Sequence, residues 1–176
     1  MRYLELRRHS LRVPPDIHLS PAGKLLAAEV GSRMGPFQRV FSSPLPRALE
    51  TARAMGFQVE QELDLMGLMP SHAERELNLA HSFAEVAQIL QIGGAAAEYG
   101  RRAADLMLSL VKRLAEGQAA LVVSHLGSIE STAITCLPSA DYTNWGRLCS
   151  YCEGVRLAFE DNKWVDIELI RVEKST

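Results

Sequence analysis

Three short apolar runs, each followed at once by a charged or titratable residue, place the strongest constraint on how this chain can fold. The first run ends in Arg8 and His9, the second is followed by Arg47, and the third ends in His125. In an open α/β sheet the carboxyl ends of the strands form the ligand crevice. Distant segments can therefore bring two histidines and two arginines together at one edge of a sheet.

The segments between these runs have helical patterns, which favours an α/β fold. Ser20 followed by Pro21 is typical of a helix start, and Gly35 followed by Pro36 of a helix end. We expect a three-layer α/β/α sandwich with a mixed, mainly parallel sheet and a small cap insertion. The expected strands are residues 3–6, 39–41, 119–123, 155–159 and 164–172, and the expected helices are residues 21–34, 46–54, 83–90, 95–115 and 129–136.

Composition narrows the class of protein. A chain of 176 residues with 47% hydrophobic content suits one domain, which we expect to span residues 1–176. The net charge of -2 gives no basic bias toward nucleic acid, and no apolar run is long enough to cross a membrane. The chain starts directly with a strand, so we expect no signal peptide and a cytoplasmic location.

The three cysteines fit a reducing compartment. Cys149 and Cys152 have the CxxC spacing, but no second pair completes a zinc site, so we interpret them as ordinary thiols. We expect neither a metal nor a cofactor.

Arginine and histidine together suit phosphate chemistry. The planar guanidinium donates paired hydrogen bonds to phosphoryl oxygens and keeps its charge. A histidine can act as a nucleophile because its pKa lies near neutrality. The four residues at the ends of the apolar runs therefore indicate a phosphate monoester site.

Three segments resemble the signature segments of the histidine phosphatase superfamily, the phosphoglycerate-mutase-like group: Leu-Arg-Arg-His at residues 6–9, Ser-Ser-Pro-Leu-Pro-Arg-Ala-Leu-Glu-Thr-Ala at 42–52, and Val-Val-Ser-His at 122–125. Leu-Ser-Pro-Ala-Gly at residues 19–23 resembles a fourth. The resemblance implies that His9 attacks phosphorus, that Arg8 and Arg47 clamp the phosphoryl oxygens, and that His125 stabilises the transition state. It also implies that no metal is needed.

Arg12 is a further candidate for phosphate binding. Residues 8–14 are similar to the RHGxRxP segment of the histidine acid phosphatase branch, with Ser10 in place of glycine. This similarity implies a third phosphate-binding arginine, and a surface loop arginine is an equally good interpretation. Leu126 follows His125 where one branch has aspartate and the other glycine, which leaves the branch open.

A general acid should protonate the leaving alkoxide. The resemblance places this acid after the second segment, where Glu62 is the first candidate and Asp64 the next. Glu74, Glu76 and Glu130 remain open.

The expected activity is hydrolysis of a phosphorylated small molecule or phosphoprotein, as in the small phosphohistidine phosphatases that the chain resembles. Phosphoglycerate mutation and non-catalytic binding of a phosphorylated ligand are the alternatives. The segment 59–94 is short for a mutase cap, which favours a phosphatase, and we expect it to set specificity. Its apolar residues Met66, Leu68 and Met69 form either a contact surface or packing over the site.

Overall fold

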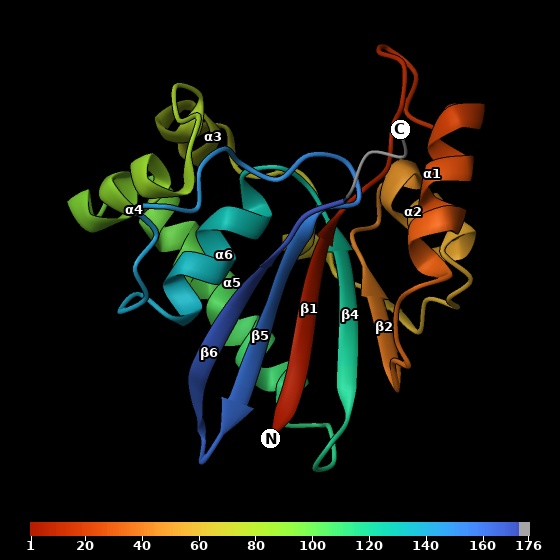
Figure 1. Cartoon of the computed structure of the whole chain (residues 1–176). Helices are drawn as coiled ribbons and strands as arrows, with labels where there is room; N and C mark the ends of the chain where they lie inside the picture. The colour runs from red at the N-terminus through yellow and green to blue at the C-terminus, as the bar shows by residue number, and fades with distance from the viewer. Residues whose placement is uncertain (173–176) are drawn as a thin grey trace.

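A six-stranded sheet forms the centre of the molecule (Figure 1). The computed structural model describes residues 1–172. Along the sheet the order is β3-β2-β4-β1-β5-β6; the first four strands are parallel, and β5 and β6 are antiparallel to their neighbours. The strands are β1 (Arg2–Arg8), β2 (Arg39–Ser42), β3 (Gln61–Glu62), β4 (Ala119–Ser124), β5 (Gly154–Glu160) and β6 (Lys163–Ile170).

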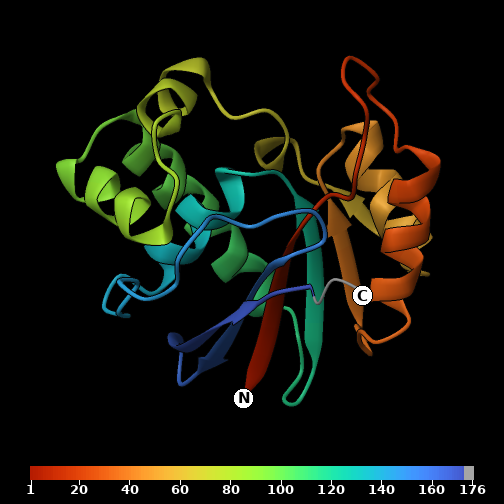
Figure 2. The same ribbon diagram turned by 45° about the horizontal axis from the view of Figure 1, so that its top comes forward.

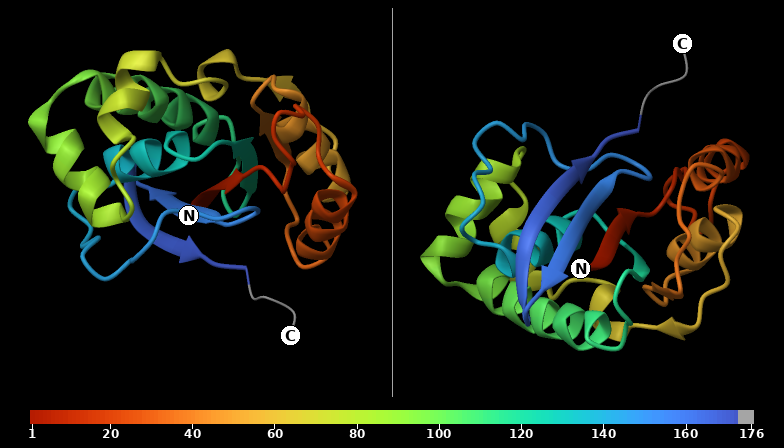
Figure 3. Two further views of the ribbon diagram at one scale, coloured as in Figure 1. Left: turned by 90° about the horizontal axis from the view of Figure 1, so that it is seen from above. Right: turned by 60° about the horizontal axis from the view of Figure 1, so that its bottom comes forward.

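Helices cover both faces of the sheet, as the alternation of side chains along β4 requires. Ala120 and Val122 pack in the large core cluster on one face, whereas Leu121 and Val123 pack with residues of α2 on the other. Two views show the three layers (Figures 1 and 3). One outer layer contains α1 (Pro21–Gly31) and α2 (Pro46–Ala54); the other contains α3 (Ser71–Leu77), α4 (Phe83–Ile92), α5 (Ala95–Val111) and α6 (Ser128–Cys136). The predicted α/β/α fold with a mixed, mainly parallel sheet is confirmed.

The helix starts follow the sequence signals more closely than the helix ends. The side chain of Ser20 caps α1 by accepting a hydrogen bond from the backbone N–H of Gly23. Two of the helices predicted from the sequence end early: α1 stops at Gly31 and α5 at Val111. After both ends the backbone tightens into i→i−3 hydrogen bonds, such as Met34 N–H to the Gly31 carbonyl. The helices predicted at residues 21–34 and 95–115 therefore included these tight turns at their C-terminal ends.

The insertion at residues 59–94 contains more regular structure than the sequence pattern indicated. Besides the predicted α4, it forms β3, a single 3₁₀ turn at Asp64–Met66 and α3. Met66 is buried in the core, so it is neither part of a contact surface nor of a cover over the site. From the tilted view, α3 lies beyond the carboxyl end of the parallel strands, and α4 lies to the side of that end (Figure 2). Within residues 1–172, no helix has the length and apolar character that crossing a membrane requires.

Candidate active site

His9 lies at the carboxyl end of β1, one of the two central strands of the sheet. It is buried, and its backbone N–H donates to the Ser124 carbonyl of β4 at 2.9 Å. Its Nδ1 lies 2.7 Å from the Ser10 carbonyl oxygen. A carbonyl only accepts, so Nδ1 carries the ring proton and Nε2 keeps its lone pair.

Ser10, at the position where the related motif has glycine, ties the His9 loop to two helices. Its backbone N–H donates to Thr51 Oγ1 of α2 at 2.8 Å, and its Oγ donates to the Gly23 carbonyl of α1 at 2.7 Å. Gly23 in turn lies so close to the loop that an added Cβ would stand 2.0 Å from the Leu11 carbonyl oxygen. The carbonyl that fixes the His9 tautomer is therefore held by packed structure.

His125 follows β4, and its ring faces that of His9 with centroids 5.2 Å apart. Ser43, which follows β2, places its Oγ 2.7 Å from His125 Nε2. The Ser43 oxygen also accepts from the Leu45 N–H at 3.2 Å, so its own hydrogen can point to the imidazole. His125 Nδ1 is then left buried without a partner among residues 1–172.

Arg47 is the second residue of α2, the helix after β2, and supplies a charge that no described side chain neutralises. Its side chain is partly buried, and no hydrogen bond or ion pair links it to another described residue. Burial lowers the pKa of Arg47, and the nearby Arg12 and Arg8 lower it further. An unpaired guanidinium in this position has free N–H donors that suit an anion.

Arg8 is held in place from the opposite side by the segment that precedes β5. Its guanidinium donates to the Cys149 carbonyl at 2.9 Å and lies 4.5 Å from the centre of the Tyr151 ring. The Tyr151 ring also lies 5.9 Å from that of His9. This segment is fixed by Glu153, which is buried and paired with Arg147 and Arg171.

Both histidines are neutral near pH 7. Burial lowers the pKa of His9 to about 4, and the charges of Arg8, Arg47 and Arg12 add to this shift. Burial also lowers the pKa of His125 to about 3, followed by the effects of His9 and the same arginines. Arg12 thus acts on the site electrostatically, while its own guanidinium donates to the Asp16 carbonyl at 2.9 Å. The surplus of positive charge suits a phosphate dianion.

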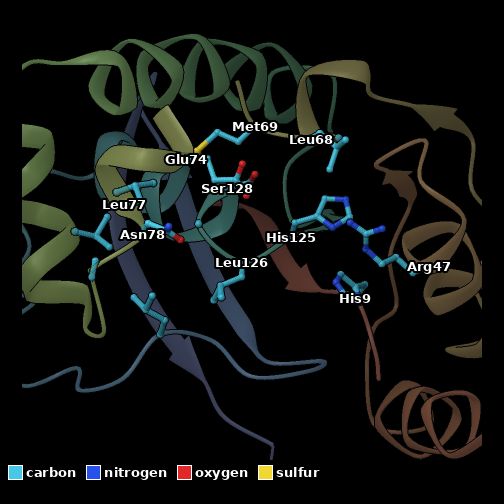
Figure 4. Close-up of a pocket in the computed structure, with 15 residues that line it drawn as sticks. His9, Arg47, Leu68, Met69, Glu74, Leu77, Asn78, His125, Leu126 and Ser128 are labelled. Atoms are coloured by element: carbon cyan, nitrogen blue, oxygen red, sulfur yellow. The ribbon is translucent and has the colours of Figure 1, made fainter. Parts of the chain in front are cut away.

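A cavity of about 290 Å³ opens beside these groups (Figure 4). His9, Arg47 and His125 lie together at one end of it, Leu77 and Asn78 from α3 and its C-terminal end lie toward the other, and Glu74 of α3 lies between the two groups. Leu68, which is 74% exposed, and Met69 line it too.

The carboxylates proposed from the sequence as general acids lie in different places. Glu62 is exposed in β3, the edge strand, and does not line the cavity, and Asp64 is also exposed and outside it. Glu76 binds the N–H groups of Ala95 and Ala96 at the start of α5. Glu130 is fully buried, where it accepts hydrogen bonds from Gly127 and Cys149. Glu74 lines the cavity.

Sequence reasoning missed Ser43 and Tyr151. The pair Ser42-Ser43 ends an apolar strand, which is the same signal that identified the histidines. Tyr151 carried no such signal because it reaches Arg8 and His9 from a loop that is remote in sequence. Cys149 and Cys152 flank this loop as buried, free thiols. The described part of the chain has no cluster of three or more histidine, cysteine or acidic side chains arranged to hold a metal ion.

Solved structures share this fold. A phosphoserine phosphatase from Entamoeba histolytica, in complex with 3-phosphoglyceric acid, has a TM-score of 0.72 at 23% identity, with 98% of each chain covered. A mycobacterial glucosyl-3-phosphoglycerate phosphatase has a TM-score of 0.70 at 17% identity, covering 98% of this chain and 100% of the other. A phosphoglycerate mutase from Bacillus anthracis has a TM-score of 0.69 at 15% identity, covering 96% and 92%. No curated protein sequence matched.

The sequence pattern of one family covers nearly the whole chain. The pattern described as the histidine phosphatase superfamily (branch 1) matches residues 5–170, which include every segment that forms the site. This match decides the question of branch that Arg12 and Leu126 had left open. The chain therefore belongs to branch 1 of the histidine phosphatase superfamily.

Proposed function

We propose that the protein is a phosphatase that hydrolyses phosphomonoesters through a covalent phosphohistidine on His9. One observation carries this proposal: His9 keeps its Nε2 lone pair free in the same cavity as Arg47, a guanidinium with no partner in the described protein. A nucleophile and an unpaired anion-binding group at the mouth of one cavity are the two parts that phosphoryl transfer requires.

In the first step His9 Nε2 forms a bond to phosphorus while the bond from phosphorus to the ester oxygen breaks. Arg8, Arg47 and His125 hold the phosphoryl oxygens, and Arg12 adds positive charge nearby. In the second step water attacks phosphorus, the phosphorus–nitrogen bond breaks, and phosphate leaves. Neither histidine must lose a proton first, because both are neutral near pH 7.

We propose Glu74, rather than Glu62, as the general acid. Glu74 is the acidic side chain among the residues that line the cavity, and Glu62 is exposed at the sheet edge. Glu74 would donate its proton to the leaving alkoxide and then take one from the attacking water. Replacing Glu74 should therefore slow the hydrolysis of phosphate esters of poorly acidic alcohols far more than the hydrolysis of esters of acidic phenols.

Hydrolysis is favoured over mutase activity because water reaches the site. Leu68 and Leu126, which line the cavity, are 74% and 43% exposed, so no segment within residues 1–172 seals it. A mutase has to protect its phosphohistidine from water. Two of the similar folds belong to a phosphoserine phosphatase and a glucosyl-3-phosphoglycerate phosphatase, which agrees with this preference. A phosphoprotein substrate is a second candidate, because the open site could admit a protruding side chain.

Steady-state hydrolysis tests the proposal. Wild type should release phosphate from 4-nitrophenyl phosphate and from an alkyl phosphate, and His9→Ala should abolish both. His81→Ala, at an exposed position between α3 and α4, is the control. Glu74→Gln should slow the alkyl ester by about 10²-fold or more and the aryl ester much less, with Glu62→Gln as its control.

Two results would count against the proposal. Equal rates in wild type and His9→Ala would indicate a phosphate-binding protein. Transfer of the phosphoryl group to an added hydroxy acid in preference to water would indicate a mutase.

A further inference from the structure

The cavity beside His9 is apolar over most of its wall. Besides the histidines, Arg47, Glu74, Asn78 and Ser128, the cavity is lined by larger apolar side chains from the loop after the 3₁₀ turn, from α3 and α4, from the turn before α6 and from the loop after α6. They are Leu68, Met69, Leu77, Val86, Leu126 and Leu148. In Figure 4 the labelled members of this wall surround the space that leads away from His9 and His125. This space is where the leaving group of a phosphate bound at His9 would lie.

Two members of the wall are leucines that the protein leaves in water. Leu68 is 74% exposed and Leu126 is 43% exposed. Apolar side chains at the rim of a pocket gain free energy when a ligand covers them. The wall is therefore suited to an apolar group that arrives with the substrate.

The charges in the cavity argue against an anionic leaving group. Among the lining residues, Arg47 is the arginine that could pair with a carboxylate. In the proposed reaction, the phosphoryl group already binds this guanidinium. The adjoining groove contains Arg147, but this guanidinium already makes two hydrogen bonds, of 2.6 and 2.7 Å, to buried Glu153. The remaining charged residue of the cavity is Glu74, a carboxylate.

The space beside His9 is matched in size by a small leaving group. Its volume of about 290 Å³ lies just below the range for small-molecule sites, which begins near 300 Å³. A short alkyl chain or one ring fits this space.

We propose that the substrate is a phosphomonoester of a small, uncharged and largely apolar alcohol, whose apolar part binds between α3, α4 and the turn before α6. This inference rests on the proposed hydrolysis at His9. It assigns the segment 59–94 a definite role, because Leu68 and Leu77 from that segment would contact the alcohol.

A homologous series of substrates tests the proposal. The primary alkyl phosphates from ethyl to pentyl have leaving groups of nearly equal acidity, so differences in kcat/KM report binding of the chain. Each methylene group that becomes buried should raise kcat/KM about fourfold, and the three added groups about 60-fold together. 3-Phosphoglycerate, which carries a carboxylate, should be hydrolysed more slowly than ethyl phosphate.

Exposed positions provide variants with little risk to folding. Leu68→Ser should reduce the preference for pentyl over ethyl phosphate by about fourfold or more, whereas Leu79→Ser, 83% exposed and outside the cavity, should leave it unchanged. Asn78→Lys, at the exposed end of α3, should raise the rate with 3-phosphoglycerate relative to ethyl phosphate.

Phosphorylation by phosphoramidate, whose leaving group is too small to fill the cavity, separates the two proposals. If His9 is phosphorylated but the alkyl series is flat, or 3-phosphoglycerate is preferred, the apolar subsite is wrong and the phosphatase stands. The apolar subsite is also wrong if the enzyme hydrolyses a phosphohistidine protein domain with a higher kcat/KM than pentyl phosphate. If no donor phosphorylates the protein, the proposed function fails.

Discussion

Acidification should destabilise this protein through the two histidines of the site. His9 and His125 are only 6% and 8% exposed, and burial beside arginines lowers their pKa values to about 4 and about 3. An unfolded histidine has a pKa of about 6.5. As the pH falls below this value, the unfolded chain binds protons that the folded protein does not, so the free energy of unfolding decreases. The loss stops growing once the folded-state pKa is passed.

The size of the effect follows from these values. With a pKa of about 6.5 in the unfolded chain and about 4 or about 3 in the folded protein, each histidine lowers the free energy of unfolding by about 2 kcal/mol between pH 7.5 and pH 5. The two together give about 4 kcal/mol, against a total stability of about 5–15 kcal/mol for an ordinary domain. The effect is therefore a large fraction of the stability.

Urea unfolding at a series of pH values, in buffer free of phosphate, measures this loss. Other groups also titrate, so the decisive quantity is the difference between wild type and the double variant His9→Asn/His125→Asn. Between pH 7.5 and pH 5, the free energy of unfolding of wild type should fall by about 4 kcal/mol more than that of the double variant. Each single variant should remove about half of this difference. His72→Asn, at an exposed position of α3, is the control. The same loss in wild type and the double variant would refute the reasoning.

Three further predictions concern the groups around His9. Arg47→Ala should lose about 2–4 kcal/mol of transition-state stabilisation, measured as kcat/KM; full activity would remove Arg47 from the site. Tyr151→Ala should weaken vanadate binding by about 0.5–1 kcal/mol because Arg8 loses its ring contact. Tyr3→Ala removes a similar contact far from the site, in which the Arg156 guanidinium lies 4.4 Å from the centre of the Tyr3 ring, and it should not affect vanadate binding. Glu153→Gln should lower the free energy of unfolding by about 3 kcal/mol, since two arginines lose their buried partner, and an unchanged urea midpoint would contradict this.

The groups that meet at the site from the sheet were predictable because each follows a short apolar strand. His9 and His125 come directly after β1 and β4, and Arg47 lies in the first turn of α2, the helix after β2. Parallel strands end at one edge, so local patterns were enough to bring these residues together. The helix starts carried equally local signals, such as the Ser20 cap of α1.

The residues contributed by other segments were not predictable in the same way. α3 has only seven residues and takes its place through Ala73 and Leu77, which are buried in the core, and through Glu76, which binds the start of α5. The position of Glu74 in the cavity depends on that packing rather than on any periodic pattern. Glu130 looked equally suitable in sequence, and burial within α6 removes it from the cavity.

The central claim, that His9 becomes phosphorylated, is tested most directly by intact-mass analysis after brief exposure to phosphoramidate and an alkaline quench. We predict one acid-labile phosphoryl adduct in wild type and in His81→Ala, and none in His9→Ala. An adduct that persists in His9→Ala, or one that survives acid, would contradict the account.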